Sequence, residues 1–105
     1  MESAQLKGLS GATYEFAVLD LDQDCPDQPG NFAFARRNDF GHWALMYVGD
    51  TDNLRRHASH HPFLNAARRS GCTHLLTHSH EDGAMARRME THDLVELFQP
   101  ALNRL

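Results

Sequence analysis

The stretch Leu45–His61, LMYVGDTDNLRRHASHH, decides the predicted fold, because an extended apolar run gives way there to a basic helix. Leu45–Val48 is apolar apart from one phenolic hydroxyl, a composition typical of a short strand. Gly49 can adopt backbone angles that are closed to other residues, so we expect the chain to turn sharply at this position. Asp50–Asn53 then offers several possible N-caps and a negative first turn, which predicts a helix immediately afterwards.

Three side chains that can carry positive charge open the predicted helix, at Arg55, Arg56 and His57. A helix that starts directly after the strand brings them close to Tyr47 at the strand's end. Guanidinium groups and a phenolic hydroxyl are both suited to phosphate oxygens. The stretch therefore indicates a place where a phosphate group could lie between the strand and the helix.

The other elements follow from apolar runs and from Gly and Pro breaks on both sides of this stretch. Strands are predicted at Tyr14–Leu21, Asn31–Arg36, Trp43–Val48 and Thr73–His78. Helices are predicted at Asn53–Ser59, from Pro62 to about Arg69, and from Glu81 or Asp82 to Phe98. The predicted order is β-β-β-α-α-β-α, an α/β or α+β domain in which about three helices flank a small mixed or antiparallel sheet.

The chain has 105 residues, enough to bury one core but not two, so a single domain spanning residues 1–105 is expected. A hydrophobic content of 41% favours a folded chain, and no segment approaches the roughly 20 apolar residues of a membrane span. The N-terminus lacks a basic region followed by an apolar one, so no signal peptide is expected. Cys25 and Cys72 are far apart in sequence, and the simplest interpretation is a cytoplasmic protein with two free thiols.

The formal net charge of −4 argues mildly against nucleic-acid binding, but the charges are unevenly distributed. Residues 1–27 carry six carboxylates and a single cation, Lys7. Residues 53–73 carry no carboxylate and four arginines, namely Arg55, Arg56, Arg68 and Arg69. These arginines are candidates for contacts with a nucleic-acid backbone. Composition alone favours the alternative that they are simply solvated helix faces.

Several motifs, in the right order, resemble those of the GIY-YIG nuclease family. Tyr47-Val48-Gly49, followed by Thr-x-Asn-Leu-Arg-Arg, resembles the family's second signature, and Pro29-Gly30-Asn31-Phe32 occupies the place of the first. Gly71–His78 resembles a later strand, and Ala86–Asn103 resembles the last helix and its Pro-x-x-Asn tail. The resemblance covers about residues 29–103 and leaves residues 1–28 as an extra N-terminal strand and an acidic loop. It implies a small sheet with helices packed around it.

The resemblance also implies a metal-dependent DNA endonuclease that acts on DNA such as branched or nicked duplexes. One divalent cation, Mg²⁺ or Mn²⁺, is expected on Glu90. Tyr47 is expected to handle the attacking water or a proton, while Arg55, Arg56 and His57 contact the phosphate. By helical periodicity Glu90 faces the domain, where a carboxylate needs a cation, a hydrogen-bond donor or a metal.

An alternative for Glu90 is a position at the edge of the apolar stripe of Leu94 and Leu97, with an ion pair to Arg87 or Arg88. The alternative differs from the metal-binding prediction in the direction in which the carboxylate points. In the first case the carboxylate faces the sheet, and in the second it faces solvent beside a guanidinium group.

The sequence departs from the family pattern at three positions. Phe32 replaces the tyrosine of the first signature, His57 replaces the usual phosphate-binding arginine, and Thr91 stands where many relatives have the glutamate. Asn103 matches a residue that supports the site, and Gly49 matches the glycine of the second signature. Loss of a preorganised donor typically lowers the rate by about 10²–10³-fold. A catalytically degenerate module that binds nucleic acid or protein is therefore the alternative function.

Histidines suggest a third, unrelated possibility, a metal site without phosphodiester chemistry. They occur at His74 and His78 on one face of a predicted strand, at His80 just beyond it, and with helical spacing at His57, His60 and His61. Zinc sites need three or four ligands that converge in space, and neither Cys-x-x-Cys nor His-Glu-x-x-His is present. We therefore expect one of these histidines to act as a base or phosphate contact rather than as part of a zinc site.

Overall fold

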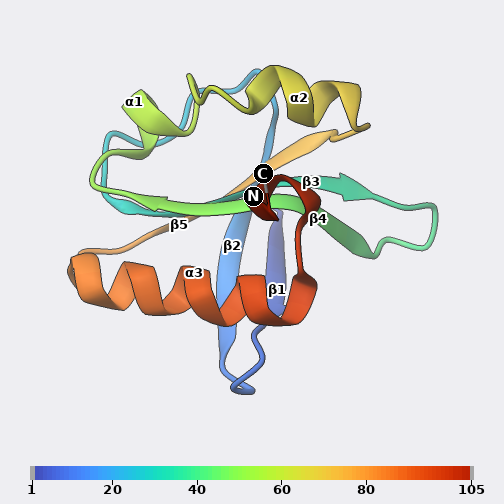
Figure 1. The fold of residues 1–105 in the computed structure, drawn as a ribbon. Helices are drawn as coiled ribbons and strands as arrows, with labels where there is room; N and C mark the ends of the chain where they lie inside the picture. Colours follow the sequence, from blue (N-terminus) through green and yellow to red (C-terminus); the bar gives the residue numbers. More distant parts are fainter. Residues whose placement is uncertain (1, 105) are drawn as a thin grey trace.

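Five strands form one antiparallel sheet in the spatial order β1-β2-β5-β3-β4 (Figure 1). The computed structural model describes residues 2–104. The strands are β1 (Ser3–Lys7), β2 (Thr13–Asp20), β3 (Gly30–Arg37), β4 (Trp43–Thr51) and β5 (His74–Ser79). The helices are α1 (Leu54–His57), α2 (Leu64–Arg69), α3 (Ala84–Phe98) and a terminal 3₁₀ turn, η1 (Ala101–Arg104).

This architecture confirms the predicted α+β fold class, with one strand more than expected. β1 was missed because it is short and has only two inward-facing apolar residues, Ala4 and Leu6, between exposed neighbours. β1 pairs with β2 and forms one edge of the sheet, where one side of the strand is left to solvent. Among the described helices, none is both long and apolar enough to cross a bilayer.

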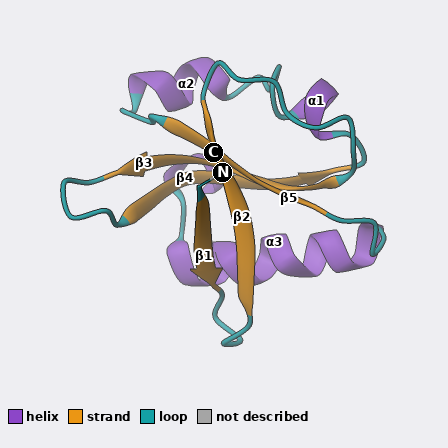
Figure 2. Cartoon of the chain, turned by 180° about the vertical axis from the view of Figure 1, so that it is seen from behind, coloured by secondary structure: helices purple, strands orange, loops and turns teal. Residues whose placement is uncertain are grey.

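Helices cover both faces of the sheet, with α1 and α2 on one side and α3 on the other (Figures 1 and 2). Along β3, successive side chains point alternately to the two sides, as expected for a strand. Phe32 and Phe34 lie in the core under α1 and α2, whereas Ala33 and Ala35 lie in the core under α3. We call these the α1–α2 face and the α3 face. This alternation determines which candidate residues can meet.

The predicted turn at Gly49 is wrong, because β4 continues through this residue to Thr51. Gly49 is instead required for space. A Cβ atom there would lie 2.8 Å from Phe32 Cζ and 3.0 Å from Tyr47 Cε2, so no larger side chain fits without moving a ring. The helix begins after Asn53, whose Oδ1 accepts a hydrogen bond from the Arg56 amide at 2.9 Å. It is a single turn rather than the predicted Asn53–Ser59 helix.

α3 starts two to three residues later than predicted, at Ala84 after Gly83, and ends at Phe98 as predicted. Leu97 was expected on the apolar stripe with Glu90, but its side chain is 45% exposed. The buried stripe consists of Glu90 and Leu94, with Val95 and Phe98 packed partly against the same core. A carboxylate thus occupies the middle of the helix face that packs on the sheet.

Candidate metal centre

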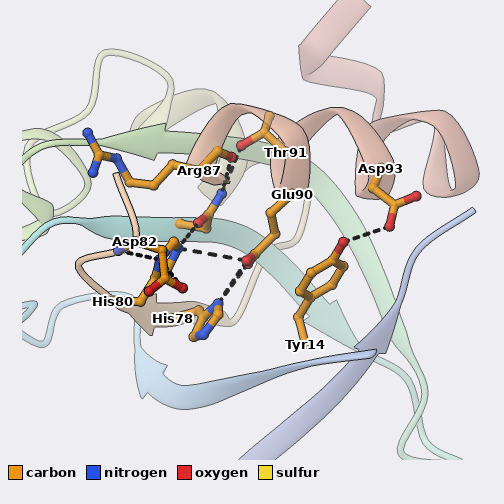
Figure 3. Close-up of polar contacts among 9 residues, drawn as sticks. Tyr14, His78, His80, Asp82, Arg87, Glu90, Thr91 and Asp93 are labelled. Atoms are coloured by element: carbon orange, nitrogen blue, oxygen red, sulfur yellow. Dashed lines mark hydrogen bonds and ion pairs between the residues drawn. The ribbon is translucent and has the colours of Figure 1, made fainter. Parts of the chain in front are cut away.

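Glu90 is buried between α3 and the sheet, with only 5% of its surface exposed. Its carboxylate meets the imidazole of His78, whose Nδ1 lies 2.8 Å from Oε2 and 3.0 Å from Oε1 (Figure 3). Burial raises the pKa of Glu90, and the hydrogen bond with His78 opposes this rise. The alternative position, at the edge of the stripe and paired with Arg87 or Arg88, is wrong because the carboxylate points inward to histidine.

His78 and His80 reach Glu90 from the end of β5. His78 shares the α3 face with Leu76, two residues before it in the strand, and packs at a tilt against the ring of Phe16. His80 follows directly after the strand, and its ring centroid lies 4.6 Å from that of His78. The Nε2 atom of His80 is 3.8 Å from Glu90 Oε1. Two imidazoles and one carboxylate therefore meet below the sheet.

Asn31 completes the polar cluster from β3. It is fully buried and lies directly opposite His78 in the register of β3 and β5. Its Nδ2 donates to the carbonyl oxygen of Arg87 at 2.8 Å and to Thr91 Oγ1 at 3.0 Å. A carbonyl can only accept, so the amide nitrogen must face α3 and Oδ1 must face the His80 Nε2, 2.8 Å away. The same contact requires the proton of neutral His80 to be on Nε2.

The geometry of the cluster suits a cation. His78, His80 and Glu90 each offer a ligand atom, and these atoms lie within 4.8 Å of one another. Burial lowers the pKa of His80, and the neighbouring His78 lowers it further, which favours the neutral imidazole that binds metals. Of the two cations implied by the resemblance, Mn²⁺ accepts nitrogen ligands more readily than Mg²⁺, which prefers six oxygens. The donor set therefore fits Mn²⁺ better than Mg²⁺.

The structure does not bring Tyr47 and Glu90 together. Tyr47 pairs with Phe34 across β3 and β4, and its ring packs on the α1–α2 face against His61 and Phe63. Phe32 lies in the same aromatic cluster, fully enclosed. Burial, and to a smaller extent Asp50, raises the pKa of Tyr47, which keeps the phenol protonated near neutral pH and leaves little phenolate to act as a base. Glu90 lies on the other face, so the sheet separates the two predicted catalytic residues.

The arginines of residues 53–73 also lie on the α1–α2 face, and the acidic loop of residues 21–29 packs beside them. The amide of Leu54 donates to the Gln28 carbonyl at 2.8 Å, and Arg55 Nε donates to the Cys25 carbonyl at 3.1 Å. Arg68 forms an ion pair with Asp22. The positive segment and the acidic segment, separate in sequence, are thus folded against each other.

All four arginines of the set are exposed. Within residues 2–104, the side chains of Arg56 and Arg69 form neither an ion pair nor a hydrogen bond, whereas Arg55 donates to Cys25 and Arg68 pairs with Asp22. His57, which stands at the position of the family's arginine, has its Nδ1 2.6 Å from Thr51 Oγ1 and 3.4 Å from the Asp52 carboxylate. Any phosphate contact on this face would therefore depend mainly on Arg56 and Arg69.

Other predicted residues have structural surroundings. Asn103 Oδ1 accepts from the Val48 amide and its Nδ2 donates to the Val48 carbonyl, both at 2.8 Å, so η1 is attached to the edge strand β4. His74 packs edge-on against Trp43. Cys25 and Cys72 are buried free thiols.

Within the described part of the chain, His78, His80 and Glu90 are the one group of three such ligands that lie close together. Sequence reasoning had paired His78 with His74 and had given Asn31 no role. The two-residue spacing of His78 and His80 was the available signal. A comparison of the chain with protein-family models, curated proteins and solved structures finds no match.

Proposed function

We propose that the domain is a divalent-cation-dependent hydrolase of phosphodiester bonds in DNA, with its cation held at Glu90. The observation that supports it is the burial of this carboxylate opposite two imidazoles rather than opposite an arginine. Burial of a carboxylate is costly, and a cation shared with His78 and His80 would offset that cost further than the hydrogen bond with His78 alone. The substrate class comes from the resemblance of residues 29–103 to the GIY-YIG nucleases.

A cation at this site would polarise the phosphate and lower the pKa of a water molecule. The protein's own contribution is to hold His78, His80 and Glu90 at fixed positions on β5 and α3. Arg87 lies one turn before Glu90. Burial lowers the pKa of His80 most, His78 lowers it further, and the charge of Arg87 lowers it to a smaller extent. Within residues 2–104 its buried Nε has no hydrogen-bond partner. Arg87 is therefore the arginine we assign to the phosphate in place of Arg55 and Arg56.

A second candidate function is a module that binds nucleic acid without cleaving it. The observation that favours it is the separation of Tyr47 and the exposed arginines from Glu90 by the sheet. In this case DNA lies on the α1–α2 face along Arg56 and Arg69. Binding should then weaken steeply with salt, because phosphate contacts release counterions.

The test is cleavage of labelled single-stranded, nicked, flapped and branched DNA with Mn²⁺ or Mg²⁺. Glu90→Gln keeps the shape of the side chain and removes its charge. The matched control is Glu96→Gln, an exposed glutamate two turns later on α3 whose carboxylate lies 3.8 Å from His92. Substituting a residue that only hydrogen-bonds to a metal ligand typically lowers activity by roughly 10–100-fold. We expect Glu90→Gln to lower the cleavage rate by more than this, and Glu96→Gln to leave the cleavage rate unchanged.

Two outcomes contradict the hydrolase. Full activity in Glu90→Gln would place the chemistry elsewhere or in a contaminant. Absence of cleavage by the wild type on every substrate, with salt-dependent binding that Arg56→Ala and Arg69→Ala weaken, would establish the binding module instead.

A further inference from the structure

We propose that His78, His80, Glu90 and the side-chain oxygen of Asn31 together form a binding site for a first-row divalent transition ion, which the two imidazoles select over Mg²⁺. The role of the cation in cleavage rests on the proposed function. The binding of the cation rests only on the four side chains. The proposed site adds a ligand, Asn31, and changes the expected cation from Mg²⁺ or Mn²⁺ to first-row transition ions with affinity for nitrogen, Mn²⁺ among them.

The distances between donor atoms agree with such a site. Four ligands at about 2.0–2.1 Å from a tetrahedral ion lie about 3.3 Å from one another. Here His78 Nδ1 is 2.8 Å from Glu90 Oε2, and His80 Nε2 is 3.8 Å from Glu90 Oε1. His80 Nε2 is 2.8 Å from Asn31 Oδ1. Each of these three distances differs from that spacing by about 0.5 Å, and the ligand atoms of His78, His80 and Glu90 all lie within 4.8 Å of one another.

The orientation of Asn31 is fixed before any cation binds. Both of its amide hydrogens are used by α3, one at the Arg87 carbonyl and one at Thr91 Oγ1. Its oxygen therefore points into the cluster and cannot rotate away without breaking both bonds. A fully buried amide whose oxygen already contacts His80 Nε2 provides a neutral oxygen ligand whose orientation is set in advance.

The proton on His80 has a place to go when Nε2 binds the ion. In the neutral ring, loss of the proton from Nε2 is balanced by its gain at Nδ1, which leaves the total charge of the imidazole unchanged. In the structure Nδ1 accepts from the Asp82 amide at 3.4 Å. Once the proton is on Nδ1, the Asp82 carboxylate, also 3.4 Å away, can accept a hydrogen bond from it instead. A carboxylate behind a metal-binding histidine commonly orients the ring and strengthens the ligand.

The simplest alternative is a purely structural network in which Glu90, the two histidines and Asn31 satisfy one another. The two possibilities differ in affinity for ions. A structural network binds no ion with one-to-one stoichiometry, whereas the proposed site follows the general order in which Zn²⁺ and Co²⁺ exceed Mn²⁺ and Mn²⁺ exceeds Mg²⁺.

The experiment is titration of chelator-treated, untagged protein with Co²⁺, followed by visible absorption, and with Zn²⁺, Mn²⁺ and Mg²⁺ by calorimetry. We expect one equivalent of Co²⁺ to give a d–d band typical of four or five ligands. His80→Ala should weaken binding at least about 10–100-fold. His92→Ala, an exposed histidine on α3, is the matched control and should bind as the wild type does. Thermal unfolding of each variant shows whether it is folded.

Asn31 is tested in the wild type, because its substitution could prevent folding. Zn²⁺ should shift the side-chain amide resonances of Asn31 in NMR spectra and leave those of exposed Asn65 in place. An unshifted Asn31 would remove it from the ligand set. No band and no heat of binding, or equal affinity for Mg²⁺ and Zn²⁺, would overturn the site.

The outcomes for the site and for the proposed function can be separated. Transition-ion binding without DNA cleavage would overturn the hydrolase and leave the site. Cleavage with Mg²⁺ by a wild-type protein that binds neither Co²⁺ nor Zn²⁺ would leave the hydrolase and overturn the site.

Discussion

At the scale of single residues, Gly49 shows how one residue type can serve two different purposes. Its unusual backbone freedom suggested a sharp turn. The structure uses its lack of a Cβ atom, since Phe32 and Tyr47 occupy the space on either side. We expect Gly49→Ala to lower the free energy of unfolding by about 1–3 kcal/mol through overpacking, as measured by urea denaturation.

A double-mutant cycle tests whether the aromatic ring is the cause. Phe32→Leu removes the Cζ and Cε1 atoms that a Cβ at Gly49 would meet at 2.8 and 3.0 Å. In the Phe32→Leu protein, Gly49→Ala should lower the free energy of unfolding by less than it does in the wild type. If both backgrounds lose the same free energy, the Phe32 ring is not the cause, and the Tyr47 ring at 3.0 Å or the backbone explains the glycine.

Tyr14 provides a second residue-scale prediction. Burial, together with its 2.7 Å hydrogen bond to Asp93, raises the pKa of the phenol to about 12. The chain has only two tyrosines, and Tyr47→Phe leaves the Tyr14 signal alone. Titration of that variant by tyrosinate absorbance should show ionisation well above the usual value of about 10. Adding Asp93→Asn should lower the midpoint, and an unchanged midpoint would mean that burial accounts for the whole shift.

The candidate site could be predicted only in part, for a physical reason. Helical periodicity placed Glu90 on an inward face, because the relevant spacing is local in sequence. Asn31 lies beside His78 only through the register of β3 and β5, which no local pattern reveals. The separation of Tyr47 from Glu90 has the same origin, because a shift of one residue along a strand changes the face.

At the scale of elements, the C-terminal turn η1 stabilises the exposed edge of β4. The Asn103 side chain pairs with both backbone groups of buried Val48, as a neighbouring strand would. We expect Asn103→Ala to lower the free energy of unfolding by about 1–3 kcal/mol, because it leaves a buried amide without a partner. Urea denaturation measures this, and Arg104→Ala in the same turn should change little. A loss as small as that of Arg104→Ala would show that water replaces the amide.

Element prediction succeeded where apolar runs were long and failed where tertiary contacts create the element. The strands β2, β3, β4 and β5 and the helix α3 were all expected, because each contains a run of apolar residues longer than is typical of a loop. β1 exists through pairing with β2. The start of α1 is fixed by Asn53 and by the loop carbonyls of Pro26 and Gln28, which accept hydrogen bonds from its first amides. Such contacts come from parts of the chain that are distant in sequence.

At the scale of the whole molecule, the two layers of helices share one sheet but differ in their chemistry. The α3 face holds the polar cluster, and the α1–α2 face holds the aromatic cluster in which His61 packs 4.8 Å from the ring of Tyr47. Burial, and to a lesser extent the charge of His57, lowers the pKa of His61. Its Nδ1 accepts a hydrogen bond from the Phe63 amide at 3.0 Å, which a proton on that nitrogen would break. The attachment of the α1–α2 layer to the sheet is therefore sensitive to acid.

The sign follows from the lowered pKa. The unfolded chain takes up a proton on His61 as the pH falls through about 6.5, while the folded protein resists protonation until lower pH. The stability associated with neutral His61 is therefore fully present above about pH 6.5 and is lost as the pH falls toward the folded pKa. Urea denaturation at about pH 7.5 and about pH 5.5 gives the free energy of unfolding lost on acidification. This loss should be smaller for His61→Leu than for the wild type. His80, whose pKa burial also lowers, contributes equally in both proteins and cancels in the difference. His92→Leu, exposed on α3, should lose as much stability as the wild type. Equal losses for wild type and His61→Leu would show that the acid sensitivity arises outside the aromatic cluster.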